Sequence, residues 1–281
     1  MSTRVAFEKA KADGRAALVG YLPAGFPDVE GAIDALKAMV AAGCDVIEIG
    51  LPYSDPVMDG PTIQAAAQQA LDGGVRTRDV LRTVEAVAAT GVPTVIMTYW
   101  NPVVSYGRAA GRSHGRSGVE RFATDLANAG GAGLITPDIT PDYGQEWIAA
   151  ADAHGLDKVF LVSPSSTDER LEMTTAACRG FVYATAVMGV TGAREKTSEL
   201  AGPLVARTKA LAPAGLPVAV GLGVSNGDQA AEVAAKDGIG ADGVIVGSAF
   251  VRAMLDNAGE RAAALRALTS LTEDLASGVR R

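Results

Sequence analysis

The sequence is poor in residues that bind metals or form disulfide bonds. Its 281 residues include two cysteines and two histidines. Cys44 and Cys178 lie in separate apolar stretches, with no second cysteine or histidine at the spacing of metal ligands, which argues against a zinc site or a disulfide framework. We expect two buried free thiols and no metal. His114 and His154 lack the partners of a Ser-His-Asp triad, so a hydrolytic triad is not expected.

Long apolar runs and an excess of positive charge are also absent. No stretch approaches the ~18 apolar residues of a membrane span, and the first residues, MSTRVAFEKAKADGR, carry charges where a signal peptide has its apolar core. The 25 Lys and Arg residues against 32 Asp and Glu give a net charge of -7, whereas nucleic-acid-binding proteins usually carry a basic surface. We expect a cytoplasmic protein that binds neither membranes nor nucleic acid.

Short apolar runs rich in β-branched residues recur along the chain. Their near-continuous apolar character is typical of parallel strands that are covered on both faces. The eight runs are Ala16–Leu22, Cys44–Ile49, Thr94–Tyr99, Gly133–Thr136, Lys158–Val162, Gly180–Thr185, Pro217–Gly221 and Gly243–Val246. Between them lie segments with helical periodicity, including Val29–Ala42, Arg76–Thr90, Gly118–Asn128, Gly144–His154 and Asn226–Asp237.

This alternation of strands and helices predicts a parallel sheet covered by helices. Eight repeats predict a (β/α)8 TIM barrel, formed by residues 1–281 as a single domain with a short N-terminal helix. An open doubly wound sheet would usually have fewer strands and a glycine-rich first turn. In a barrel, active-site residues lie in the loops that follow the strands, at the carboxyl ends of the strands.

Glu48 is the most informative residue at these strand ends. It shares a strand face with Val46 and Cys44, near the end where a barrel active site would open. A buried carboxyl group is neutral, paired or functional. Glu48 is therefore either a structural carboxylate or an acid/base catalyst, and burial would raise its pKa and suit it to proton exchange.

Asp59 follows in the long segment after the second strand, within PVMDGPT. Asp-Gly-Pro alone indicates a turn. Because the segment belongs to the same βα loop as Glu48, Asp59 offers a second carboxylate that could accept a hydrogen bond from a substrate N–H group. Asp55 precedes a proline and is interpreted as a loop-shaping residue.

Glycine clusters follow the last three predicted strands. The clusters are Gly189–Gly192, Gly221–Gly223 and Gly247 with Ser248. Loops after strands seven and eight, with a helix N-terminus, form a recurrent phosphate site in this fold, and Ser248 could add a hydroxyl donor. Tyr183 could lie over a ligand or fill the core. The clusters predict a phosphate-bearing ligand.

Several distinctive motifs follow one another along the chain. They are GYLPAGFPD (20–28), IEIGLPYSDPVMDGPTIQ (47–64), MTYWNP (97–102), GLITPD (133–138), GVTGAR (189–194), GLGVSN (221–226) and GSAFV (247–251). These motifs resemble those of tryptophan synthase alpha chains. They occur in the family's order over nearly the whole chain. The resemblance implies a barrel that cleaves indole-3-glycerol phosphate to indole and glyceraldehyde 3-phosphate, without metal or organic cofactor.

The resemblance also implies a role for each matching residue. Glu48 would protonate indole C3 and take the proton of the glycerol hydroxyl, and Asp59 would bind the indole N–H. The pocket would be lined by Tyr21, Met97, Tyr99 and Tyr183, and the phosphate would lie on Gly192, Gly223, Gly247 and Ser248. Thr191 would belong to a lid that closes over the ligand.

The family's partner is a beta chain, and the implied assembly is an α2β2 complex that passes indole to this pyridoxal-phosphate enzyme. The cofactor is therefore expected only in the partner. Arg108–Ser117 looks like extra sequence near Asn101 and Pro102, which face the beta chain in the family, and it could alter docking. Thr140 in place of a common proline and the stretch 186–188 are further departures.

Three further hypotheses stay open on the sequence alone. The chain could be a free-standing indole-3-glycerol-phosphate lyase of the same descent. It could be another phosphate-binding barrel, such as a phosphoribosyl isomerase, although the context of Glu48 and Asp59 disfavours this. It could also be a weakly catalytic subunit that mainly activates the beta chain.

Overall fold

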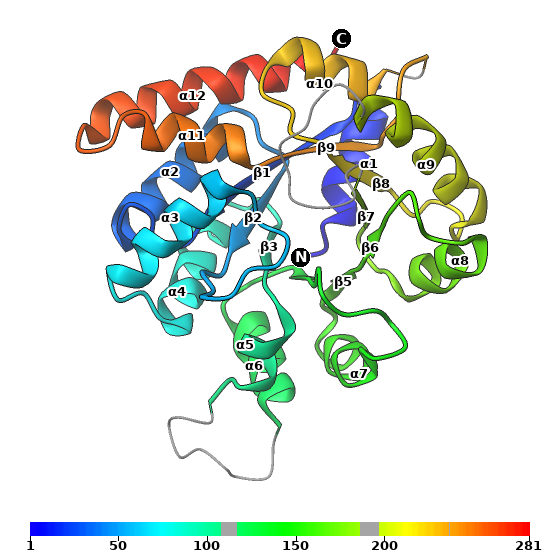
Figure 1. Ribbon diagram of the computed structural model, residues 1–281, viewed down its shortest axis with the longest axis horizontal. Coiled ribbons are helices and arrows are strands. Elements are labelled where there is room, and N and C mark those ends of the chain that lie inside the picture. Colours follow the sequence, from blue (N-terminus) through cyan, green and yellow to red (C-terminus); the bar gives the residue numbers. More distant parts are fainter. Residues whose placement is uncertain (108–116, 186–196, 236) are drawn as a thin grey trace.

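A parallel sheet forms the centre of the molecule, and helices surround it (Figure 1). The computed structural model describes residues 1–107, 117–185, 197–235 and 237–281. The strands are β1 (Ala17–Pro23), β2 (Val46–Gly50), β3 (Thr94–Met97), β4 (Gly133–Ile135), β5 (Asp157–Val159), β6 (Leu161–Val162), β7 (Val182–Thr185), β8 (Val218–Gly221) and β9 (Gly243–Val246). Each predicted apolar run contains strand residues, so the predicted barrel fold is confirmed.

The sheet curls until its two ends nearly meet. Its strand order is β5-β4-β3-β2-β1-β9-β8-β7-β6, and the end strands β5 and β6 are separated in the chain by Phe160 alone. The Phe160 carbonyl accepts a hydrogen bond of 3.1 Å from the Tyr183 backbone N–H on β7. The predicted strand 158–162 is therefore two strands, because the chain changes partner from β4 to β7 at this residue.

Helices alternate with the strands. The helices are α1 (Arg4–Ala12), α2 (Val29–Ala42), α3 (Pro61–Asp72), α4 (Thr77–Ala88), α5 (Trp100–Val104), α6 (Gly118–Asn128), α7 (Gln145–His154), α8 (Asp168–Ala177), α9 (Thr197–Leu211), α10 (Gly227–Ala234), α11 (Ser248–Leu255) and α12 (Arg261–Gly278). The predicted bounds of α2 and α6 agree with the structure because both helices carry strong end signals. Asp28 caps α2 by accepting the Gly31 N–H at 2.7 Å, and Ser117 and Glu120 form a capping box at α6.

Two layers of apolar side chains hold the barrel. The larger layer lies between the strands and the surrounding helices. The smaller layer fills the barrel interior, where Val19, Val46 and Val95 pack with Phe7 of α1. The rings of Phe7 and Phe181 lie 5.1 Å apart, so α1 closes the barrel at the end opposite the strand carboxyl termini.

A buried carboxylate fastens α1 in this position. Asp157, at the start of β5, has no exposed surface. It accepts hydrogen bonds from the Thr3 backbone N–H and Thr3 Oγ1, each at 2.7 Å, and from Ser2 Oγ at 2.8 Å. Arg179 Nε lies 3.6 Å from the same carboxylate. These bonds satisfy backbone and side-chain donors at the start of α1.

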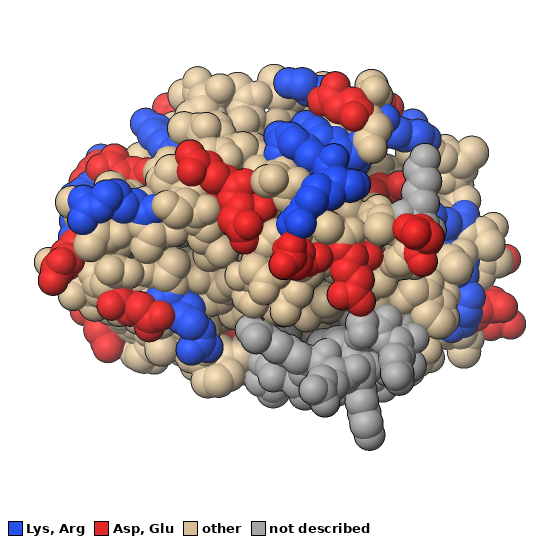
Figure 2. Space-filling model, turned by 90° about the horizontal axis from the view of Figure 1, so that it is seen from above, with Lys and Arg blue, Asp and Glu red and all other residues tan. Residues whose placement is uncertain are grey.

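Positively and negatively charged side chains lie close together on the protein surface. On the face shown in Figure 2, acidic and basic side chains lie next to one another, and this face offers no continuous basic surface. Exposed ion pairs such as Arg261 with Asp34 and Arg281 with Asp228 are part of this pattern. Among the described residues, no helix is long and apolar enough to cross a membrane.

We expect Asp157→Ala to lower the free energy of unfolding by about 2–4 kcal/mol, because it leaves the buried donors of Thr3 and the half-buried hydroxyl of Ser2 without an acceptor. The measurement is urea denaturation followed by circular dichroism. Asp34→Ala is the matched control: it breaks the half-exposed pair with Arg261 and should change stability by less than about 0.5 kcal/mol. Equal losses in both variants would show that Asp157 does not fasten α1.

Candidate active site

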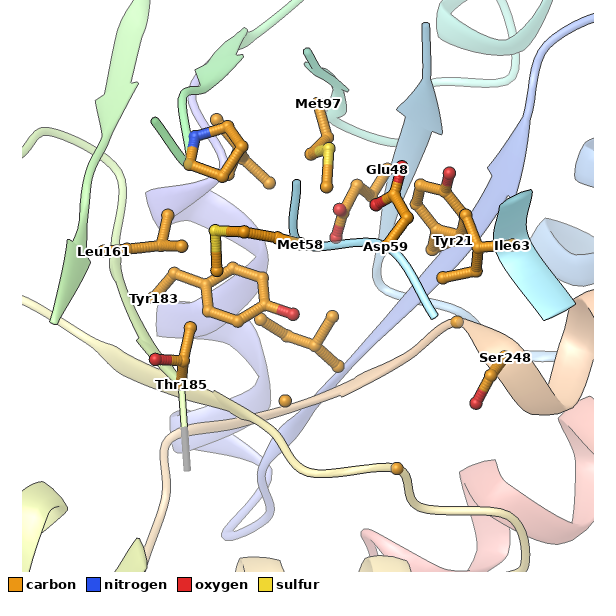
Figure 3. A pocket seen from close by; sticks show the side chains of 16 residues that line it. Tyr21, Glu48, Met58, Asp59, Ile63, Met97, Leu161, Tyr183, Thr185 and Ser248 are labelled. Carbon is orange, nitrogen blue, oxygen red and sulfur yellow. The ribbon is translucent and has the colours of Figure 1, made fainter. Parts of the chain in front are cut away.

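A cavity opens at the carboxyl ends of the strands (Figure 3). Its volume is about 860 Å³, open mouth included. The lining residues come from most strands of the barrel and from the loop after β2. They are Tyr21, Glu48, Met58, Asp59, Ile63, Met97, Ile135, Pro137, Leu161, Tyr183, Thr185, Gly221, Gly223, Ile245, Gly247 and Ser248. The cavity therefore lies where the barrel fold usually places chemistry.

Glu48 lies in the wall of this cavity and is almost completely buried. It is 2% exposed, and its Oε2 atom is buried without a hydrogen-bond partner among the described residues. Burial, and secondly the negative charge of Asp59, raise the pKa of Glu48 to about 8. Near pH 7, Glu48 therefore holds a proton that it can donate.

Asp59 reaches the same part of the cavity from the loop between β2 and α3, as Figure 3 shows. Burial raises its pKa, while the Tyr99 hydroxyl opposes this shift. Asp59 is less buried than Glu48, so it loses its proton first. The two carboxyl groups can thus act as one acid and one carboxylate.

Two tyrosines stand on the cavity wall beside these carboxyl groups. Tyr21 and Glu48 are register partners on β1 and β2, and Tyr183 extends from β7. Burial raises the pKa of both phenols above the usual value of 10, and the charges of Asp59 and Glu48 raise it further. Both hydroxyl groups therefore stay neutral and can donate hydrogen bonds to a ligand.

Glycines make room for these rings. A Cβ atom on Gly50 would lie 2.2 Å from the Tyr21 hydroxyl oxygen, and one on Gly221 would lie 2.3 Å from that of Tyr183. Each glycine stands on the strand next to its tyrosine. Because each glycine lacks a side chain, the tyrosine ring on the adjacent strand can occupy the space beside it.

The structure places three of the four predicted pocket residues in the cavity. Tyr21, Met97 and Tyr183 line it, but Tyr99 does not. Tyr99 is 3% exposed and packs beneath the loop after β2, where its hydroxyl accepts the Met58 N–H at 3.0 Å. Its hydroxyl therefore meets the loop backbone beside the cavity, and its role as a lining residue stays a prediction.

Another part of the cavity wall is formed by glycine backbone and Ser248. Gly223, Gly247 and Ser248 line it, as does Gly221. Gly247 is the N-cap of α11 and Ser248 is its first residue, so the N-terminus of this helix opens on the cavity. Such an end with a hydroxyl group beside it suits an anion. The predicted residues Thr191 and Gly192 lie outside the described residues.

Apolar residues that the sequence did not single out complete the cavity. Met58 points into it from the position next to Asp59, and Ile63 and Leu161 form further wall. Leu161 follows from strand alternation, because Tyr183 is its register partner on the neighbouring strand. The position of Met58 could not be predicted, since a single apolar residue in a loop shows no hydrophobic periodicity.

The described residues contain no group of three or more His, Cys, Asp or Glu side chains that could hold a metal ion. Cys44 is buried and Cys178 is half-buried, and both are free thiols. Burial raises the pKa of Cys178 to about 12. The cavity brings the carboxyl groups of Glu48 and Asp59 together with an apolar wall, which fits a flat ring, and with the N-terminus of α11, which suits an anion.

Known proteins match the chain over nearly its full length. The family model of the tryptophan synthase alpha chain matches residues 7–280. The tryptophan synthase alpha chain of Salinispora arenicola is 61% identical over 276 residues, which are 98% of this chain and 97% of that protein. The chain belongs to the tryptophan synthase alpha chain family.

Solved structures agree with this assignment. A chain of Mycobacterium tuberculosis tryptophan synthase is 51% identical, with a TM-score of 0.87 over 99% of this chain and 98% of that chain. The tryptophan synthase alpha subunit of Legionella pneumophila is 28% identical, with a TM-score of 0.84 over 99% and 98% of the two chains. Membership in the tryptophan synthase alpha chain family implies a lyase activity in tryptophan synthesis.

We expect Gly221→Ala to destabilise the protein by about 1–3 kcal/mol, because the new Cβ displaces the Tyr183 ring. Tyr183→Phe removes the atom at 2.3 Å and leaves Cζ at 2.9 Å, so the double variant should recover part of the loss. The measurement is urea denaturation of the four proteins of this cycle. For the control Gly202→Ala, no atom of the described residues lies within 4 Å of the new Cβ, so this substitution should show no coupling to Tyr183→Phe.

Glu48→Gln should stabilise the protein increasingly as pH rises. The folded pKa of about 8 lies above the unfolded value of about 4.3, so the wild-type protein loses stability between these two values and the Gln variant does not. Between pH 5 and pH 8, the free energy of unfolding of Glu48→Gln should rise by about 2–4 kcal/mol relative to that of the wild-type protein. Urea denaturation at both pH values measures it. A difference that is the same at both values would mean that Glu48 titrates normally.

Proposed function

We propose that the chain is the alpha subunit of tryptophan synthase and cleaves indole-3-glycerol phosphate to indole and glyceraldehyde 3-phosphate. The observation that carries this proposal is a protonated Glu48 beside Asp59 in a cavity with an anion-binding end. The alternatives of a free-standing lyase and of a weakly catalytic activator of the beta chain are outcomes of the experiment below.

Glu48 supplies the acid and then the base of this retro-aldol reaction. Its proton goes to C3 of the indole ring, which makes the ring a leaving group. As the bond between C3 and the glycerol carbon breaks, its electrons return to the ring and the hydroxyl on that carbon becomes the aldehyde. The Glu48 carboxylate takes the hydroxyl proton, so the residue is restored at the end of the reaction.

Asp59 stabilises the positive charge that develops on the ring. Protonation at C3 turns the ring into an indoleninium whose N–H is a strong donor, and a carboxylate is its best acceptor. The apolar wall formed by Met58, Met97 and Leu161 excludes water around this pair, which strengthens the interaction.

The phosphate group binds at the other end of the cavity. Backbone N–H groups near Gly223 and Gly247, with the Ser248 hydroxyl, face this end at the start of α11. Thr191 and Gly192 complete the site as parts of a lid that closes over the substrate. No cofactor is needed in this chain, because proton transfer accounts for every step.

The beta chain is the partner that receives indole, in an α2β2 complex, and pyridoxal phosphate belongs to that partner. The related Mycobacterium tuberculosis structure is one of tryptophan synthase, which supports this assembly. Of the extra sequence Arg108–Ser117, all but Ser117 lies outside the described residues. The whole chain acts as one cytoplasmic domain.

We expect the purified chain to release indole and glyceraldehyde 3-phosphate in equal amounts, slowly alone and faster with a cognate beta chain. Equal rates would indicate a free-standing lyase, and activation of the beta chain without cleavage would indicate a weakly catalytic subunit. Glu48→Gln should lower kcat at least about 100-fold while substrate affinity changes little, because the swap keeps the shape and removes the proton.

The pH profile of the wild-type chain gives a second readout. Because Glu48 must be protonated, kcat/KM should fall above pH 8, near its pKa of about 8.

Asp55→Asn is the matched control for Glu48→Gln, since Asp55 is exposed in the loop after β2 and lies outside the cavity. If Glu48→Gln and Asp55→Asn lowered kcat equally, the role of Glu48 would be contradicted.

A further inference from the structure

We propose that Tyr99 is a positioning residue that holds Asp59 and Met58 in the cavity by hydrogen bonds to the loop that carries them. This inference rests on the proposed function, since it concerns the carboxylate that stabilises the indole ring. The loop is defined as residues 51–60, between β2 and α3.

Among the described residues, few other hydrogen bonds fix the part of this loop that contains Met58 and Asp59. Leu51 N–H donates to the Met97 carbonyl at 2.9 Å, which fixes the beginning of the loop. Farther along, the Asp59 carbonyl accepts from Gln64 Nε2 at 2.7 Å, but Gln64 belongs to α3, which follows the loop directly. The bond from Met58 N–H to the Tyr99 hydroxyl, at 3.0 Å, joins this part of the loop to the N-cap residue of α5, which follows β3.

Tyr99 is itself held firmly. The Asp138 carboxylate accepts the N–H of the next residue, Trp100, at 2.9 and 3.0 Å, which fixes the backbone at the start of α5. The rings of Tyr53 and Tyr99 lie 5.4 Å apart. Tyr99 is 3% exposed, and burial raises its pKa to about 12, so its phenol stays neutral. A hydroxyl on such a rigid base can define the position of a loop.

The Tyr99 hydroxyl acts on two neighbouring residues at once. Its oxygen accepts the Met58 N–H, which leaves its hydrogen to interact with the Asp59 carboxylate. Burial raises the pKa of Asp59, and this interaction opposes the rise. Tyr99 therefore favours the ionised form of Asp59, and it fixes the backbone from which Met58 enters the cavity.

The test is Tyr99→Phe, which keeps the ring and removes the hydroxyl. We expect kcat for indole release to fall roughly 10- to 100-fold with less than a threefold change in KM, because the lost interaction matters most when the ring is positively charged. The acid limb of the pH profile should move to higher pH, since Asp59 loses the interaction that lowers its pKa. Amide hydrogen exchange at Met58 should become faster in the substrate-free protein.

Tyr106→Phe is the matched control. The Tyr106 hydroxyl also donates to an aspartate, Asp125 on α6, at 2.7 Å, and Tyr106 is outside the cavity. This variant should leave the acid limb and the exchange at Met58 unchanged. If Tyr99→Phe only lowers stability and leaves both readouts as in the control, the positioning role is overturned.

The two proposals fail in different ways. If the wild-type chain releases no indole with or without a beta chain, the proposed function fails, while the exchange at Met58 still tests whether Tyr99 orders the loop. If the wild-type chain is active and Tyr99→Phe has a wild-type acid limb, only the positioning role fails.

Discussion

The removal of one carboxyl group from water determines the rest of the active site. Glu48 can hold a proton near pH 7 because it is 2% exposed and lies near Asp59. Its surroundings must therefore exclude water without supplying a cation, and the wall of Tyr21, Met97 and apolar side chains does so. The barrel makes this possible because adjacent parallel strands bring such residues to one end of a closed interior.

The two ends of the barrel divide stability and chemistry between them. At one end, α1 closes the interior, with Asp157 satisfying the donors of Ser2 and Thr3. At the other end, the Glu48 Oε2 atom has no hydrogen-bond partner among the described residues. A buried carboxylate whose oxygens accept hydrogen bonds stabilises the fold. A buried carboxyl group without hydrogen-bond partners has a raised pKa and can exchange protons near neutral pH. Buried carboxyl groups therefore have contrasting surroundings at the two ends.

The sequence predicted the barrel well because buried parallel strands leave continuous apolar runs, and helix ends such as Asp28 and Ser117 carry local signals. The sequence also predicted that Glu48 and Asp59 lie close together, since both belong to one βα unit, and both line one cavity in the structure. The Tyr99 ring direction was not predictable in this way, because it follows β3 and strand alternation no longer applies there. The change of partner at Phe160 likewise depends on closure of the sheet, which a local pattern does not contain.

The contact between Tyr21 and Gly50 has a consequence for how this family can diverge. Since the phenol occupies the space of a side chain at position 50, position 50 cannot gain a side chain while the Tyr21 ring stays in place. A relative with a smaller residue in place of Tyr21 can accept alanine at position 50, and a relative with glycine there can vary its aromatic ring. Sequence variation at these two strand positions should therefore be correlated, although the residues lie on different strands of the barrel.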